Sequence, residues 1–280
     1  TCDERLWRVL AMFFTFRRIF DMTTDRIVMF DTPIDRLTLN ETVGKVDDAI
    51  RQKKQLHHIA VNVAKIVNMQ KDKNLYESVV SADIINADGA PLVWVSRLFG
   101  RPLPERVAGI DLMEALVARA HERGYKIFFL GAREEVVKKV AEIYAHQYGV
   151  EILAGYRNGY FDEQTEPEVV RQIASSGANI LFVAMTSPKK EIFLHKYKEQ
   201  LRDLNFIMGV GGSFDVVAGK VKRAPKWMQK CGLEWLFRVI QEPGRMWKRY
   251  LVTNTLFVYY ILKEVFKPKT QSIAEHKNVS

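Results

Sequence analysis

The sequence has few of the residues that hold small or extracellular proteins together. Its 280 residues include two cysteines, Cys2 and Cys231, which are too few and too far apart to predict a disulfide framework or a zinc site. The six histidines include no pair four residues apart around a carboxylate, the pattern of a catalytic metal on a helix. We therefore expect a reducing compartment, no metal and no cofactor.

Long apolar runs are also missing. A helix that spans a bilayer needs about 20 apolar residues. The longest candidates here are residues 6–20, which Arg17 and Arg18 interrupt, and residues 256–262. The same arginines come too early for a signal peptide, and a first residue other than methionine is typical of a fragment. We expect neither a transmembrane segment nor export.

Two phosphate-binding fingerprints are absent. No G-x-G-x-x-G opens the first predicted strand and no G-x-x-x-x-G-K-[ST] occurs, so a classical dinucleotide-binding protein and a P-loop enzyme lose their main support. Short turns rich in glycine, serine or proline do follow three predicted strands, at residues 130–132, 185–188 and 209–213. Such turns expose N–H groups that suit a diphosphate, but every α/β protein also needs tight turns.

What the sequence does contain is an alternation of strand-length apolar runs with amphipathic stretches. Strands are predicted at residues 27–30, 59–61, 126–130, 180–185 and 206–210, and helices at residues 39–54, 63–72, 112–123, 134–148 and 166–175. This order predicts an α/β fold with a largely parallel sheet and helices on both faces. The length and the 48% apolar content suffice for one such domain and an appendage.

The positive charge is concentrated near the C-terminus. Twelve basic and three acidic residues lie between Lys220 and Lys269, so this segment alone accounts for the net charge of +9. We expect two helices here, at residues 227–241 and 245–266, separated by a break at residues 242–244. The change in composition places the start of an appendage near residue 220.

The turn Asn86-Ala87-Asp88-Gly89 is the clearest candidate for chemistry. An apolar run delivers Asp88 to the corner between a predicted strand and the next apolar segment. Ligands of open α/β sheets collect outside the carboxyl ends of the strands, where a carboxylate is well placed to act as a base. Asp88 also has a simpler interpretation as the N-cap of the following helix, a position that Asp favours.

Several further motifs follow in a fixed order. They are RVAGID at residues 106–111, GYF at 159–161, SPKKE at 187–191, GVGGSFD at 209–215, RAP at 223–225, GLEWLFR at 232–238 and EPGR at 242–245. With this set the chain closely resembles the WecG/TagA/CpsF glycosyltransferases, bacterial enzymes that add a sugar to a polyprenyl-diphosphate-linked glycan. The resemblance covers residues 27–250.

The resemblance implies an inverting, metal-independent glycosyltransferase with a modified Rossmann-like core and a C-terminal appendage that completes the site at the membrane. It implies a nucleotide-diphosphate donor, expected to be UDP-linked. Asp88 matches the proposed catalytic base, and Arg106 matches the arginine that binds the donor diphosphate. From the residues alone, Arg106 is equally an ion-pair partner of Glu105 or Asp111, and Asp111 is equally a helix cap.

The resemblance also implies the binding positions. For the donor and other substrate they are Asn62, Asn86, Arg106, Asp111, Lys190, Glu191, Gly211, Gly212 and Asp215. For a diphosphate or a membrane surface, the appendage offers Arg223, Arg238, Arg245, Lys248 and Arg249.

Two positions depart from the family pattern: Ala60 stands where members commonly carry Thr, and Lys190 where they commonly carry Gln. A buried ammonium group favours an anionic partner. The departure at Lys190 therefore suggests a uronic acid donor. If Lys190 is solvated or pairs with Glu191 instead, a neutral sugar such as glucose or N-acetylmannosamine remains open.

Residues 245–269 suggest contact with a membrane. They mix aromatic and aliphatic side chains with Lys and Arg, as in a helix that lies on an anionic lipid surface. A helix packed on the core or across a dimer explains the aromatic residues equally well. A nucleic-acid partner is not expected, because no recognised binding motif accompanies the basic charge.

Four segments are thus expected: an amphipathic extension (1–25), a catalytic core (26–219), a basic aromatic appendage (220–269) and a polar tail (270–280). The expected protein is peripheral on the cytoplasmic, inner face of the bacterial cell membrane and binds a nucleotide sugar, a lipid-linked glycan and anionic lipid. A homo-oligomer is left open. The alternative is a noncatalytic glycan-assembly subunit that kept the fold, against which Asp88 and Arg106 speak.

Overall fold

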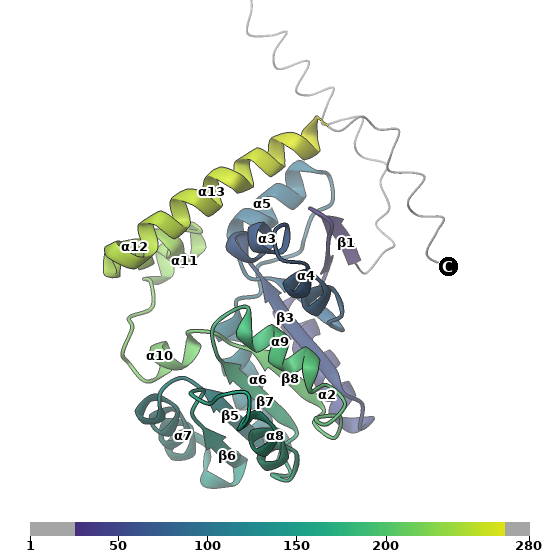
Figure 1. Cartoon of the computed structure of the whole chain (residues 1–280), viewed down its shortest axis with the longest axis vertical. Coiled ribbons are helices and arrows are strands. Elements are labelled where there is room, and N and C mark those ends of the chain that lie inside the picture. Colours follow the sequence, from purple (N-terminus) through teal and green to yellow (C-terminus); the bar gives the residue numbers. More distant parts are fainter. Residues whose placement is uncertain (1–25, 267–280) are drawn as a thin grey trace, which may run out of the picture.

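A six-stranded parallel sheet forms the centre of the computed structural model, which describes residues 26–266 (Figure 1). In sheet order, the strands are β4 (Ile84–Ala87), β3 (Leu56–Val61), β8 (Phe206–Gly209), β7 (Ile180–Ala184), β5 (Ile127–Gly131) and β6 (Leu153–Arg157). All neighbouring pairs run parallel. The expected α/β class is confirmed.

Helices cover both faces of this sheet. Successive residues of a strand point to opposite faces, so each strand contributes to an apolar cluster on either side. Phe129 and Phe182 pack into one apolar cluster, whereas their neighbours Phe128 and Leu181 pack into another. The first cluster is covered by α2 (Leu39–Arg51), α6 (Gly109–Arg123) and α7 (Glu134–Tyr148), and the second by α8 (Glu166–Ala174) and α9 (Lys189–Lys196). A third cluster joins β3 and β4 to α3 (Val63–Met69), α4 (Lys73–Val80) and α5 (Ala90–Leu98).

The first predicted strand belongs to a hairpin and not to the parallel sheet. β1 (Arg26–Met29) pairs antiparallel with β2 (Thr32–Asp35), and the two residues between them have positive φ angles of 52° and 57°, as in a type I′ turn. The Asp35 carboxylate accepts hydrogen bonds from Arg26 (2.8 Å) and from the backbone N–H of Ile85 (2.6 Å). The hairpin is thereby fastened to β4 at the edge of the sheet.

The C-terminal part is helical. After α10 (Ser213–Val217) come α11 (Lys226–Lys230), α12 (Glu234–Gln241) and α13 (Pro243–Val265). The single helix expected over 227–241 is wrong, because Gly232 with a φ of +67° divides it. An added Cβ there would lie 2.7 Å from Ala90 and from Trp94 of α5, so glycine permits this close approach.

Helix α13 packs against α3 (Figure 1), and its Phe257 contacts Phe30 edge-on, with ring centroids 5.2 Å apart. Within residues 26–266, no helix has both the length and the apolar character needed to cross a bilayer. The expected appendage boundary near residue 220 falls between α10 and α11. The expected N-terminal extension and polar tail lie outside the described residues.

Candidate active site

Asp88 lies where β4 ends and α5 begins. Its backbone N–H donates to the carbonyl of Val61 at the end of the neighbouring β3 (2.8 Å). Its carboxylate accepts a hydrogen bond from the N–H of Gly109 at the start of α6 (3.2 Å). The N-cap of α5 is Gly89, and no side chain caps this helix. The structure therefore contradicts the simpler interpretation, in which Asp88 is the N-cap of α5.

The surroundings of Asp88 make it a stronger base than an exposed carboxylate. The residue is half-buried as a whole, but protein surrounds its carboxyl group. This burial raises the pKa of Asp88 to about 6, although Arg106, the N–H of Gly109 and Arg238 act in the opposite direction. A general base works best with a pKa near the operating pH. Asp88 is therefore ionised at neutral pH, yet more basic than an exposed carboxylate.

Arg106 forms an ion pair with the C-terminal appendage. Its guanidinium forms an ion pair with Glu234 of α12 and lies 3.7 Å from the Asp111 carboxylate of α6. Arg223, which precedes α11, contacts the same two carboxylates, with Asp111 at 2.6 Å and Glu234 at 3.8 Å. Glu105, the other expected partner, instead accepts a hydrogen bond from the N–H of Leu39 at the start of α2 (2.6 Å).

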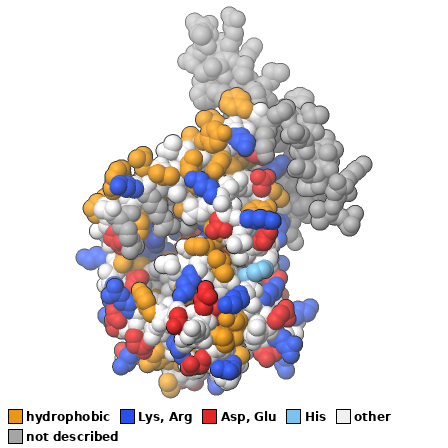
Figure 2. Space-filling view, in the orientation of Figure 1, with side chains coloured by type: hydrophobic (Ala, Val, Ile, Leu, Met, Phe, Trp, Pro, Cys, Tyr) orange, Lys and Arg blue, Asp and Glu red, His pale blue; other side chains and the backbone are white. Residues whose placement is uncertain are grey.

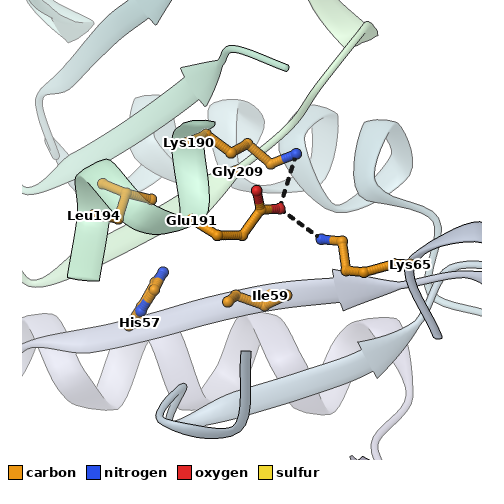
Figure 3. Close-up of a pocket in the computed structure, with 7 residues that line it drawn as sticks. All are labelled: His57, Ile59, Lys65, Lys190, Glu191, Leu194 and Gly209. Atoms are coloured by element: carbon orange, nitrogen blue, oxygen red, sulfur yellow. Dashed lines mark hydrogen bonds and ion pairs between the residues drawn. The ribbon is translucent and has the colours of Figure 1, made fainter. Parts of the chain in front are cut away.

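A second charged cluster lies between α3 and α9 (Figure 3). Glu191 is fully buried, and its Oε1 is 2.9 Å from Nζ of Lys65 and 3.1 Å from Nζ of Lys190. Burial opposes ionisation of Glu191, but the two ammonium groups outweigh it and hold the pKa of Glu191 well below its usual value. Burial and the charge of Lys65 lower the pKa of Lys190 to about 8.

Sequence reasoning found Lys190 and Glu191 but missed Lys65, which looked like one polar position on an amphipathic helix. These three residues line a pocket with His57, Ile59, Leu194 and Gly209. The space has a volume of about 190 Å³, solvent at its open side included. Gly209 leaves room for the Lys190 side chain as it lies here, since an added Cβ would be 2.6 Å from its Cε.

The two predicted asparagines are held within the fold. Asn62 caps α3, its side chain accepting from the N–H of Lys65 (3.0 Å). Asn86 is buried in β4, where its Oδ1 lies 2.8 Å from Nε2 of His58 and accepts from the Thr42 hydroxyl (3.3 Å). Asn62 is thus at the carboxyl edge of the sheet, whereas Asn86 lies beneath it. Their roles in binding stay predictions.

The remaining predicted positions are spread over the loop after β8 and the appendage. Gly211 has a φ of +55°, and neither it nor Gly212 has an atom within 4 Å of an added Cβ, so the turn leaves open space there. Asp215 lies on α10, and its backbone carbonyl accepts hydrogen bonds from the N–H groups of Lys220 and Val221.

The predicted cations of the appendage differ in their distance from the site. Arg238 is close enough to influence Asp88 electrostatically, while Lys248 is exposed beside Trp247. The side chains of Arg245 and Arg249 lie outside what the structure describes.

Five charged residues therefore meet at the carboxyl edge of the sheet, where α/β proteins bind ligands. They are Asp88, Arg106, Asp111, Arg223 and Glu234. The arrangement offers one carboxylate base and two guanidinium groups suited to a diphosphate. Across residues 26–266, no group of three or more His, Cys, Asp or Glu is placed to hold a metal ion.

Comparisons with known proteins identify the family of the chain. The family model described as "Glycosyl transferase WecG/TagA/CpsF family" matches residues 27–271. Two similar proteins both carry the name N-acetylglucosaminyldiphosphoundecaprenol N-acetyl-beta-D-mannosaminyltransferase. The protein from Bacillus spizizenii is 42% identical over 178 residues, which are 63% of this chain and 67% of the relative. The protein from Bacillus subtilis is 38% identical over 200 residues, which are 71% and 76% of the two chains. Because the family match spans most of its length, the chain belongs to the WecG/TagA/CpsF family of glycosyl transferases.

Proposed function

We propose that this chain transfers N-acetylmannosamine from a UDP-linked donor to N-acetylglucosaminyl diphosphoundecaprenol, the acceptor that the names of both Bacillus relatives contain. The observation that carries the proposal is the placement of Asp88, a carboxylate with a raised pKa at the carboxyl edge of the sheet, within electrostatic range of Arg106. A base and a fixed cation are the two groups that sugar transfer without a metal requires.

The proposed reaction is a single displacement with inversion. The acceptor hydroxyl oxygen bonds to the anomeric carbon of the donor while its proton passes to the Asp88 carboxylate. The bond from that carbon to the diphosphate oxygen breaks, and UDP leaves with the electron pair. Arg106 and Arg223, which lie around the same two carboxylates, supply positive charge for the leaving diphosphate.

A uronic acid is the second candidate for the transferred sugar, because two buried ammonium groups share one carboxylate beside the pocket. A sugar carboxylate near Lys190 would balance the extra positive charge. Glucose has no observation in its favour. Lys190→Gln should then lower kcat/KM for a uronic acid donor about tenfold and leave a neutral donor nearly unchanged. The matched control is Lys189→Gln, an exposed neighbour, and an unchanged donor ranking in Lys190→Gln would reject the uronic acid.

The proposed working place is the cytoplasmic face of the cell membrane. Large apolar side chains are exposed along α13, among them Trp247, Leu251, Tyr259 and Leu262, and hydrophobic atoms gather over this part of the surface in Figure 2. Lys248 lies beside Trp247, with its Nζ 5.7 Å from the ring centroid. Aromatic and basic side chains together suit an interface with anionic lipid. Trp247→Ser/Leu251→Ser should weaken binding to anionic vesicles, and equal binding would argue against the contact.

The proposed reaction is tested by incubating the protein with UDP-linked sugars and the lipid-linked acceptor. We expect UDP release that depends on the acceptor, and a product heavier by one sugar residue. The rival proposal, a noncatalytic glycan-assembly subunit, predicts acceptor binding without UDP release. A panel of UDP-linked N-acetylmannosamine, its uronic acid and glucose identifies the donor in the same experiment.

A further inference from the structure

Helix α5 begins immediately after the Asp88-Gly89 turn and carries two exposed apolar side chains. Leu92, Val93 and Val95 face the core. Trp94 and Leu98 face outward and are 50% and 49% exposed. They are four residues apart and therefore lie one above the other on the same side of the helix. Single exposed apolar residues are ordinary, but this pair lies directly beside the proposed catalytic carboxylate.

The other described elements around Asp88 present charge to it. Arg106 comes from the loop before α6, Arg238 from α12 and Lys190 from α9. On α5, two of the three exposed side chains are apolar, Trp94 and Leu98, and the third is Arg97. An apolar chain that leaves the site at this edge therefore meets exposed apolar side chains along α5.

The appendage borders this surface. Gly232, in the turn between α11 and α12, lies so close to α5 that an added Cβ would be 2.7 Å from both Ala90 and the indole of Trp94. The turn thus contacts the indole of Trp94, which nevertheless stays 50% exposed where the core meets the appendage. On the appendage side, Trp227 of α11 is also exposed.

We infer that the outer face of α5, through Trp94 and Leu98, binds the polyprenyl chain of the acceptor next to the catalytic turn. This inference rests on the proposed function, because it assigns the lipid half of that acceptor. The diphosphate end of the acceptor is anionic, and Arg106 and Arg238 supply positive charge beside Asp88, at the end of α5 from which the chain would leave. A chain laid along α5 would direct the sugar hydroxyl toward Asp88.

The test measures binding and transfer with two acceptors that share the same sugar diphosphate, one with the undecaprenyl chain and one with a short alkyl chain. Trp94→Ala/Leu98→Ala should raise the KM and the Kd for the long-chain acceptor at least about tenfold, because apolar contact area is lost. Both constants for the short-chain acceptor should stay within about twofold. The matched control is Val150→Ala, which changes a residue 72% exposed in the short helix η1 (Val150–Ile152), before β6 at the opposite edge of the sheet.

Each other outcome overturns the inference. Equal losses with both acceptors would mean that α5 supports the site and not the chain. Unchanged constants would mean that the chain lies elsewhere. An equal loss of binding to vesicles without acceptor would make the surface a bilayer contact. Binding is measured without donor, so a wild-type protein that binds the long-chain acceptor through α5 but transfers no sugar would overturn only the proposed reaction.

Discussion

The guanidinium of Arg106 forms an ion pair with the carboxylate of Glu234, which lies 128 positions further along the chain. Arg106 belongs to the loop before α6, whereas Glu234 begins α12. The pair fastens the appendage to the rim of the site. A diphosphate that binds Arg106 must therefore displace the carboxylate of Glu234 or share the guanidinium with it, which couples donor binding to the docking of the appendage.

Glu234→Gln removes the negative charge that competes with a diphosphate for Arg106. We expect UDP to bind the variant about threefold more tightly, because charged hydrogen bonds to the guanidinium become free. Titration calorimetry with UDP measures the change. Glu163→Gln, at an exposed residue of a remote loop, is the control. Weaker binding by Glu234→Gln would mean that Glu234 orients Arg106 for the donor instead of competing with it.

Asp88→Asn removes the proposed base while keeping nearly the same shape. We expect kcat to fall by about 10²–10⁴-fold, the usual contribution of a general base. UDP binding and the urea midpoint should change little, since the amide oxygen can still accept from Gly109. Asp203→Asn, at an exposed position, serves as control. Turnover near that of the wild type would exclude Asp88 as the base.

The activity should depend on pH through the same carboxyl group. Because the pKa of Asp88 is about 6, the base is protonated and inactive below that value and becomes active as the pH rises through it. We expect log kcat/KM to rise with a slope near one below pH 6 and to level off above it. Residual activity of Asp88→Asn should lack this limb. A wild-type profile that is flat between pH 5 and 7 would contradict the assignment.

Substitutions within the buried Lys65–Glu191–Lys190 cluster should lower the free energy of unfolding by unequal amounts. Glu191→Gln leaves two buried ammonium groups without a counter-charge and should lower the free energy of unfolding by about 3–5 kcal/mol. Lys65→Met leaves Glu191 paired with Lys190 at 3.1 Å and should cost less than half as much. Urea unfolding gives both values. Lys73→Met, in the exposed Lys73–Glu77 pair, should change stability by less than about 0.5 kcal/mol; the reverse order of the first two variants would refute the prediction.

Two adjacent histidines of β3 predict acid sensitivity. Burial lowers the pKa of His57 and His58 to about 4, so both are neutral in the fold but protonate near pH 6.5 when the chain unfolds. The unfolded state then binds more protons, and each histidine should lower the free energy of unfolding by about 2 kcal/mol between pH 7 and pH 5. The raised pKa of Asp88 has the opposite effect: its carboxyl group takes up a proton in the fold before it does so in the unfolded chain, which adds about 1 kcal/mol to the free energy of unfolding over the same interval.

The expected net loss is therefore about 2–3 kcal/mol over that interval, measured by urea unfolding at pH 7 and pH 5. His121→Gln, at an exposed position, should leave the loss unchanged. His58→Gln should reduce it, because one of the two protonation sites of the unfolded state is gone. Equal stability of the wild type at the two pH values would show that the histidines are not held neutral by the fold.

Local patterns in the sequence determined the architecture. β5 and β7 are buried on both faces, which is why they appear as unbroken apolar runs, and helical periodicity marked the helices that cover them. The motif order identified the family, and the turn after β4 singled out Asp88. These features depend on residues within about one helix or strand length of each other, so the sequence carries them directly.

Only the tertiary structure decided how charges from distant elements are paired. Arg106 was expected beside Glu105 or Asp111, but its closest partner is Glu234 from the appendage. Lys65 looked like one polar position on a helix, yet it shares Glu191 with Lys190. The order of strands in the sheet brings α3 beside α9 and the appendage against α5. No spacing along the chain encodes these approaches, because they follow from the joint packing of apolar faces across the whole fold.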